Sequence, residues 1–125
     1  MKLLLDTHIY LWWLEDSPML PAPARKMIAT AEKVYVSSAS LWESAIKAGI
    51  GKLDVNQEEL VSGILESGFT ELPVRTEHTV ALLRLENHHK DPFDRMLIAQ
   101  AISEPLHLLT ADSILTRYSS LVISV

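Results

Sequence analysis

The chain begins with MKLLLDTHIYLWWLE (residues 1–15), in which a short apolar run leads directly into an acid and a helix-like segment. The run Lys2–Leu5 has the length and character of a buried strand, and it stops at Asp6. Apolar residues then recur over Thr7–Glu15 in a pattern that predicts a helix. A buried strand that passes straight into a helix at an acid is the unit from which we predict the rest of the fold.

The alternation of strand and helix continues to the end of the chain. Further strands are predicted at 34–36, 69–74, 106–109 and 121–125, the one at 69–74 on an edge because Pro73 interrupts it. Helices are predicted at 21–32, 41–48, 57–66, 76–87, 92–104 and 112–118. Strands that alternate with helices form parallel sheets with helices on both faces. We therefore predict one α/β domain over residues 1–125, with a mainly parallel five-stranded sheet.

Two helices carry predictions about burial. In the helix at 76–87, the apolar residues Val80, Leu82 and Leu83 are expected to face the core. In the first helix, the adjacent tryptophans Trp12 and Trp13 cannot both face the core of a surface helix. Either one of them lies in an exposed apolar patch that a partner or second copy covers, or the first helix is well covered between the sheet and a neighbouring element.

Composition narrows the class of protein. Hydrophobic residues make up 48% of the chain, enough for a buried core, and there is no cysteine. The lack of cysteine excludes a disulfide framework, a thiol nucleophile and a cysteine-ligated zinc site, and it fits a reducing cytoplasm. No apolar run approaches the roughly 18 residues of a membrane span. We expect a cytoplasmic protein without a membrane partner.

The net charge of −5 is at first sight wrong for a protein that binds nucleic acid, because phosphate binding favours a basic surface. However, four of the sixteen acids belong to the candidate site described next, and they account for most of this charge. A site for divalent cations carries its own excess of acid. The charge therefore weakens a nuclease hypothesis without excluding it.

Four acids fall where predicted strands pass into helices. Asp6 follows the first strand, and Glu43 lies early in the helix after the second. Asp94 lies in the first turn of a later helix, and Asp112 follows the fourth strand. Ligands of open α/β sheets bind beyond the carboxyl ends of the strands. The four acids are therefore predicted to share one edge of the sheet.

Each acid alone also has an ordinary structural explanation. Glu43 completes a capping box with Ser40 and stands four residues before Lys47. Asp91 and Asp112 are suited to helix N-caps. Capping acids need not converge, however, and like charges 4 Å apart repel by roughly 4 kcal/mol at an effective dielectric near 20. A convergent cluster is tolerable when a divalent cation neutralises it.

Oxygen-only ligands suit Mg²⁺ or Mn²⁺, as one ion or as a pair. Such ions polarise a phosphoryl oxygen and activate water for in-line attack, which is the chemistry of phosphodiester hydrolysis. The pattern of acids therefore indicates a metal-dependent phosphodiesterase.

Around these acids the sequence resembles the PIN domain family, and most closely the VapC-type toxins of type II toxin–antitoxin modules. The similar stretches are LDTH at 5–8, SASLWE at 38–43, DPFDRMLIAQA at 91–101 and LTAD at 109–112. They occur in the family's order and span essentially the whole chain, and DPFDRMLIAQA is the most specific. The resemblance implies a Rossmann-like three-layer α/β/α sandwich and an Mg²⁺- or Mn²⁺-dependent endoribonuclease that cuts structured RNA.

The resemblance also implies residue roles and partners. Asp6, Glu43 and Asp94 are similar to the family's core catalytic metal ligands, and Asp112 to a more variable fourth acid. Such toxins usually form dimers and are held inactive by a cognate antitoxin. We therefore expect RNA as substrate, an antitoxin as protein partner, and a homodimer.

Further polar residues are expected to support the site. The resemblance matches Thr7 and Thr110 to small polar positions beside the site. Asp91 and Arg95 stand next to Asp94 in the sequence, and Arg95 is placed to contact phosphate or to pair with Asp91 or another site acid. Lys47 and Lys52 flank a glycine turn and are either contacts to the RNA backbone or ordinary solvated lysines.

Histidine is disfavoured as a ligand by sequence reasoning. His88 and His89 are adjacent and so point in different directions, and no nearby acid pair completes a transition-metal site. We therefore expect a solvated loop there. His8 is expected to pack or to support the site rather than to act in catalysis.

Other functions remain as alternatives. A haloacid-dehalogenase-like phosphatase needs a second Asp two residues after the first, where His8 stands. A phosphorelay receiver needs an Asp at the end of a middle strand, where Ser37 follows Val36. Two alternatives stay open: a PIN-like module that binds RNA or protein without cutting, and a nuclease that acts on DNA.

Overall fold

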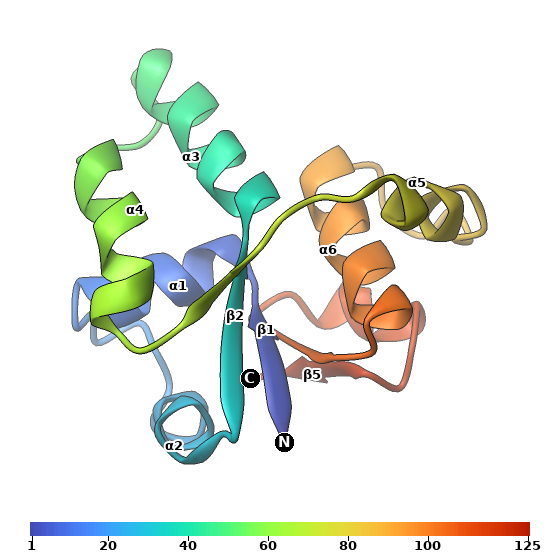
Figure 1. The fold of residues 1–125 in the computed structure, drawn as a ribbon, viewed down its shortest axis with the longest axis horizontal. Helices are drawn as coiled ribbons and strands as arrows, with labels where there is room; N and C mark the ends of the chain where they lie inside the picture. The colour runs from blue at the N-terminus through green and yellow to red at the C-terminus, as the bar shows by residue number, and fades with distance from the viewer.

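The computed structural model describes residues 1–125 as a single sheet of five parallel strands with connecting helices (Figure 1). The strands are β1 (Lys2–Leu5), β2 (Lys33–Ser37), β3 (Thr70–Leu72), β4 (His107–Thr110) and β5 (Val122–Ser124). The helices are α1 (Thr7–Leu14), α2 (Ala22–Thr30), α3 (Ser38–Gly49), α4 (Gln57–Glu66), α5 (Thr76–Leu83), α6 (Pro92–Ser103) and the short 3₁₀ helix η1 (Ser113–Arg117). The predicted α/β class with a parallel five-stranded sheet is confirmed.

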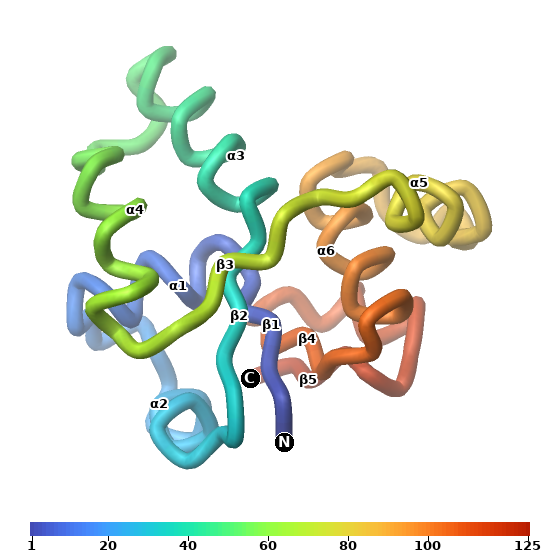
Figure 2. The backbone as a smooth tube through the Cα atoms, viewed as in Figure 1, coloured from blue at the N-terminus to red at the C-terminus, as the bar shows by residue number.

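The strand order is β3-β2-β1-β4-β5, which places the first strand at the centre. From β1 the chain builds outward through β2 to β3, the edge strand that Pro73 predicts, and then returns to lay β4 against the other side of β1. Figure 2 shows the segment after β3 passing from the side of α4 to the side of α5. The boundary between β1 and β4 is therefore a topological switch point, where α/β sheets bind their ligands.

Alternate residues of β1 enter two separate cores. Leu3 and Leu5 pack with α1, α2 and α4 on one face, whereas Leu4 packs with α6 on the other. Figure 1 shows these helices on opposite sides of the sheet. A sheet that is buried on both faces explains why its strands read as continuous apolar runs. The three-layer α/β/α arrangement is confirmed.

Helix α5 differs from the prediction. It ends at Leu83, four residues early, and Val80 and Leu83 are 52% and 88% exposed, so the expectation that they face the core is wrong. The residue of α5 that is fully buried is His78. Its Nδ1 accepts from the backbone N–H of Arg75, and its Nε2 lies 2.6 Å from a carboxylate oxygen of Glu104. These polar partners make burial of the imidazole possible.

Of the two alternatives for the adjacent tryptophans, the exposed patch is wrong and the well-covered helix is confirmed. Trp12 and Trp13 are both half-buried and pack against the core on the α1 side, and Trp13 lies 5.7 Å from Phe69 between ring centroids. Helix α1 is covered from more than one direction because it contacts α3, α4 and β4. The exposed tryptophan is instead Trp42 on α3, which is 64% exposed.

The longest helices, α3 and α6, have 12 residues, and none of the helices combines the length and hydropathy needed to cross a bilayer.

The buried hydroxyl of Tyr10 gives a first prediction. It donates to the carbonyl of Leu60 at 2.7 Å and so joins α1 to α4. Replacement of Tyr10 by Phe removes this hydrogen bond between the helices, and we expect a loss of about 1 kcal/mol in the free energy of unfolding. Tyr35→Phe is the matched control, because its hydroxyl makes no hydrogen bond in the structure. Equal denaturation midpoints for the two variants would contradict the role given to Tyr10.

Candidate metal-binding site at the carboxyl edge of the sheet

Asp6 lies at the switch point between β1 and β4 and is 7% exposed. It is the N-cap of α1, with one carboxylate oxygen accepting from the backbone N–H of His8 at 3.0 Å. The other oxygen accepts from the hydroxyl of Thr110 at 2.6 Å, and the backbone N–H of Asp6 donates to the carbonyl of Leu109. The ends of the two central strands therefore hold this carboxylate from both sides.

Glu43 enters the same region from α3 and is 4% exposed. The N-cap of α3 is Ser37, whose hydroxyl accepts from Ala39, so the capping box with Ser40 predicted as an ordinary explanation of Glu43 is wrong. The strand β2 passes into α3 without a loop, and the helix therefore starts three residues earlier than predicted.

The carboxylate of Glu43 is instead fixed by long-range and helical contacts. Its Oε1 accepts from the hydroxyl of Thr7 at 2.7 Å. Its Oε2 lies 2.6 Å from the ammonium of Lys47, which confirms the pairing four residues along the helix. The hydroxyl of Thr7 therefore fixes the position of the Glu43 carboxylate.

Asp91 and Asp94 make different contacts at the start of α6. One oxygen of Asp91 accepts from the backbone N–H groups of Phe93 and Asp94, both at 2.9 Å, so Asp91 is the N-cap. Asp94 is then not needed for capping, and its carboxylate accepts from Nε2 of His89 at 2.9 Å. Asp112 caps η1 through one oxygen, which accepts from Ile114 at 3.1 Å.

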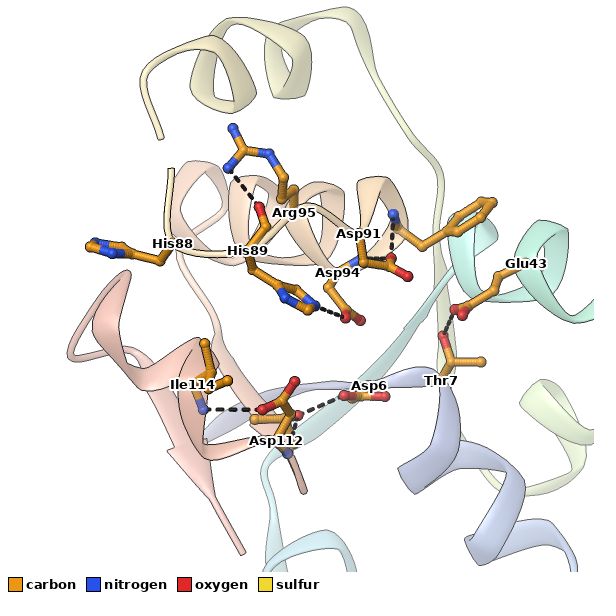
Figure 3. Close-up of polar contacts among 12 residues, drawn as sticks. Asp6, Thr7, Glu43, His88, His89, Asp91, Asp94, Arg95, Asp112 and Ile114 are labelled. Atoms are coloured by element: carbon orange, nitrogen blue, oxygen red, sulfur yellow. Dashed lines mark hydrogen bonds and ion pairs between the residues drawn. The ribbon is translucent and has the colours of Figure 1, made fainter. Parts of the chain in front are cut away.

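These side chains line one open pocket of about 550 Å³ (Figure 3). It is lined by Asp6, Glu43, Asp91, Asp94 and Asp112, together with His8, Trp12, Lys47, His89 and Ala111. The four predicted acids therefore meet at one edge of the sheet, although they come from four separate parts of the chain. Within the pocket, the tightest group of potential ligand atoms is that of His89, Asp94 and Asp112, which lie within 4.8 Å of one another. Asp6 and Glu43 are held beside this group by Thr110, Thr7 and Lys47.

The pocket concentrates negative charge. Burial, together with the charges of Asp6 and Asp91, raises the pKa of Asp94 to about 6, against the opposing effect of the hydrogen bond from His89. Burial also raises the pKa of Asp6, although the hydrogen bond from Thr110 opposes it. The hydrogen bond to Glu43 raises the pKa of Lys47. Carboxyl groups that resist ionisation together are a donor set that a hard divalent cation fits.

Two residues that were expected to serve the site, Arg95 and Lys52, do not line the pocket. Arg95 forms no ion pair with an acid; its guanidinium donates to the carbonyl of Glu86 at 2.9 Å and to the hydroxyl of Tyr118 at 3.1 Å. It faces the loop before α6, so the alternative in which Arg95 pairs with Asp91 or another site acid is wrong. Lys52 is exposed and outside the pocket, whereas Lys47 lines it.

His89 is the pocket residue that sequence reasoning missed. Adjacent histidines do point apart: the ring of His88 packs edge-on against Tyr118, and His89 turns toward Asp94. The expectation of a merely solvated loop is wrong for His89, because Asp94 and Asp112 supply the nearby acid pair. A sequence signal was present, since a residue five positions before Asp94 lies near the start of α6 and hence at the same edge of the sheet.

The fold and site define a class: a parallel α/β domain with an acidic pocket at the switch point of its sheet. A family model for the PIN domain matches residues 3–121, and the chain belongs to the PIN domain family. No curated protein matches the sequence significantly.

Two solved structures share the fold. The first contains VapBC2 from Rickettsia felis bound to a DNA fragment from the VapBC2 promoter. The matched chain has a TM-score of 0.73 and 20% sequence identity, and the match covers 99% of this chain and 98% of that chain. A chain of FitAB bound to the IR36 DNA fragment has a TM-score of 0.66 and 17% identity, over 98% and 94% of the two chains. At these identities the likeness concerns the fold.

The pKa of Asp94 gives a prediction for the protein in EDTA. Between about pH 4 and about pH 6 the folded chain holds more protons at Asp94 than the unfolded chain, so stability falls as pH rises through this range. With a shift of about two units at about 1.4 kcal/mol each, Asp94→Asn should be more stable than wild type above pH 6 by about 2 to 3 kcal/mol. Thermal or urea unfolding against pH measures both effects, with the exposed Asp54→Asn as control. A wild-type stability that rises over this range with no gain in Asp94→Asn would contradict the account.

Proposed function

We propose that this chain is an Mg²⁺- or Mn²⁺-dependent endoribonuclease and the toxin of a type II toxin–antitoxin module. The observation that carries the proposal is the meeting of Asp6, Glu43, Asp94 and Asp112 in one pocket at the switch point of the sheet. The raised pKa values of Asp6 and Asp94 support it, because they mark a charge cluster that a divalent cation would relieve. Membership of the PIN family supports nuclease chemistry, since its members are generally metal-dependent nucleases.

The residues take distinct roles. Asp6 and Asp94 would hold a divalent cation, which supplies polarisation of the phosphodiester and easier ionisation of the attacking water. Glu43 orients that water, and the hydroxyl of Thr7 fixes the direction of its carboxylate. Asp112 closes the opposite side of the pocket, with its backbone N–H held by Thr110. Thr110 thus positions two acids through one hydroxyl.

Lys47 is the residue best placed to meet RNA. Its ammonium lies at the pocket, paired with Glu43 and within the field of Asp91 and Asp94. It can contact the scissile phosphate without leaving the site. Lys52, beyond the end of α3, would contact the RNA backbone further away.

The proposed partners are an antitoxin and a second copy of this chain in a bacterial or archaeal cytoplasm. Both solved neighbours are named as two-component complexes bound to DNA, which supports an antitoxin here. An apolar groove of about 480 Å³ supports a protein partner as well. It lies between α3, α5 and α6 and includes Trp42, Val74, Phe93 and Met96.

Cleavage assays test the proposal. We expect the purified chain to cut structured RNA in the presence of Mn²⁺ or Mg²⁺, and we expect EDTA to abolish this cleavage. Asp6→Asn and Asp94→Asn should each lower the rate by at least about a hundredfold, because each removes a carboxylate charge that would hold the cation at the scissile phosphodiester. The control Asp54→Asn replaces an exposed acid outside the pocket and should leave the cleavage rate unchanged.

The outcomes separate the alternatives. Cleavage that persists in EDTA, or at full rate in Asp94→Asn, would overturn the proposal. Cutting of single-stranded DNA but not of RNA of the same sequence would replace the ribonuclease with a deoxyribonuclease. RNA binding without cleavage in either metal would indicate the non-cutting module.

A further inference from the structure

We propose that His89, Asp94 and Asp112 form a mixed nitrogen and oxygen metal position, in which the imidazole of His89 is a direct ligand. The inference rests on the proposed function and adds a nitrogen donor to a site otherwise made of carboxylates. Its consequence is a preference of this position for Mn²⁺ over Mg²⁺, because imidazole suits transition metals and Mg²⁺ favours oxygen ligands.

The spacing of the ligand atoms suits one ion. Potential ligand atoms of the three residues lie within 4.8 Å of one another. Nε2 of His89 and Oδ2 of Asp94 are 2.9 Å apart. Two ligands about 2.1 Å from an octahedral ion, at right angles, are separated by about 3.0 Å. A cation can therefore take the place of the proton between these two atoms with little movement, and the neutral imidazole would then carry its single proton on Nδ1.

The acids of this group retain oxygens for an ion. Asp112 uses Oδ1 to cap η1, and its other oxygen makes no hydrogen bond in the structure. Asp94 is free of capping because Asp91 caps α6, and only its Oδ2 is engaged, by His89. Figure 3 shows the three side chains approaching one another from the loop before α6, from α6 itself and from the segment after β4.

The loop that carries His89 is anchored from behind. The guanidinium of Arg95 and the hydroxyl of Tyr118 both donate to the backbone carbonyl of His89, at 3.4 and 3.3 Å. Arg95 also holds the carbonyl of Glu86, and its guanidinium lies 5.9 Å from the centre of the Tyr118 ring. These contacts fix the backbone and aim the imidazole into the pocket. Arg95, adjacent to Asp94 in sequence, is on this interpretation a positioning residue for His89.

The neighbouring histidines provide matched controls. His88 points away from the pocket, where it pairs with Glu86 at 2.8 Å and packs on Tyr118. His8 lines the pocket but is exposed and lies beside Trp12, outside the tight group. Substitution of His88 or His8 therefore distinguishes a nitrogen ligand supplied by His89 from a histidine that only lies near the metal position.

Pulsed electron paramagnetic resonance of the tag-free protein loaded with one equivalent of Mn²⁺ tests the inference. We expect ¹⁴N coupling from a directly bound imidazole in wild type, its loss in His89→Gln, and its retention in His88→Gln and His8→Gln. By calorimetric titration, His89→Gln should bind Mn²⁺ on the order of tenfold more weakly, with Mg²⁺ affinity changed less than about twofold. Thermal unfolding of each variant in EDTA checks that it is folded, and His89→Asn serves as a second substitution.

Each result decides one point. If Mn²⁺ binds but wild type shows no ¹⁴N coupling, or His89→Gln keeps it, His89 is only a hydrogen-bond donor to Asp94. The inference is then overturned, and the proposed nuclease stands. An equal loss of Mn²⁺ and Mg²⁺ affinity in His89→Gln also overturns the preference. If neither ion binds wild type at all, the proposed function fails together with the inference.

Discussion

The hydrogen bond from Thr110 to Asp6, across the boundary between β1 and β4, is the contact on which the pocket depends. These strands lie side by side only because the chain returns to the centre of the sheet after building β2 and β3. The same hydroxyl accepts from the backbone N–H of Asp112 and so sets the direction of the chain into η1. One threonine therefore joins two site acids that are more than a hundred residues apart in sequence.

Repulsion between the acids is the cost of this arrangement, and local structure offsets part of it. Asp6, Asp91 and Asp112 each accept backbone N–H groups at the start of a helix, where the helix dipole favours negative charge. The capping explanations and the functional explanation are thus compatible, because these acids cap helices through one carboxylate oxygen and their side chains also line the pocket. Asp94 has no such capping role, and its pKa is raised to about 6.

The fold class and the edge of the sheet that carries the acids were predictable because they follow from local patterns. Strand β1 is a continuous apolar run, Asp91-Pro92 marks the start of α6, and residues after parallel strands share one edge. The remainder depends on tertiary contacts that no local pattern contains. Helix α3 begins at Ser38 because β2 leads into it without a loop, and His89 turns inward because Arg95 and Tyr118 anchor its backbone. The burial of His78 likewise requires Glu104, 26 residues away.

The central claim is that these scattered carboxylates gather to hold a divalent cation. Anomalous diffraction from crystals of the wild-type chain grown with Mn²⁺ tests it most directly. The account predicts a strong peak in the pocket, about 2.0 to 2.4 Å from carboxylate oxygens of Asp6 or Asp94. A saturated crystal with no peak in the pocket, or with Mn²⁺ bound only at acids elsewhere on the surface, would contradict it.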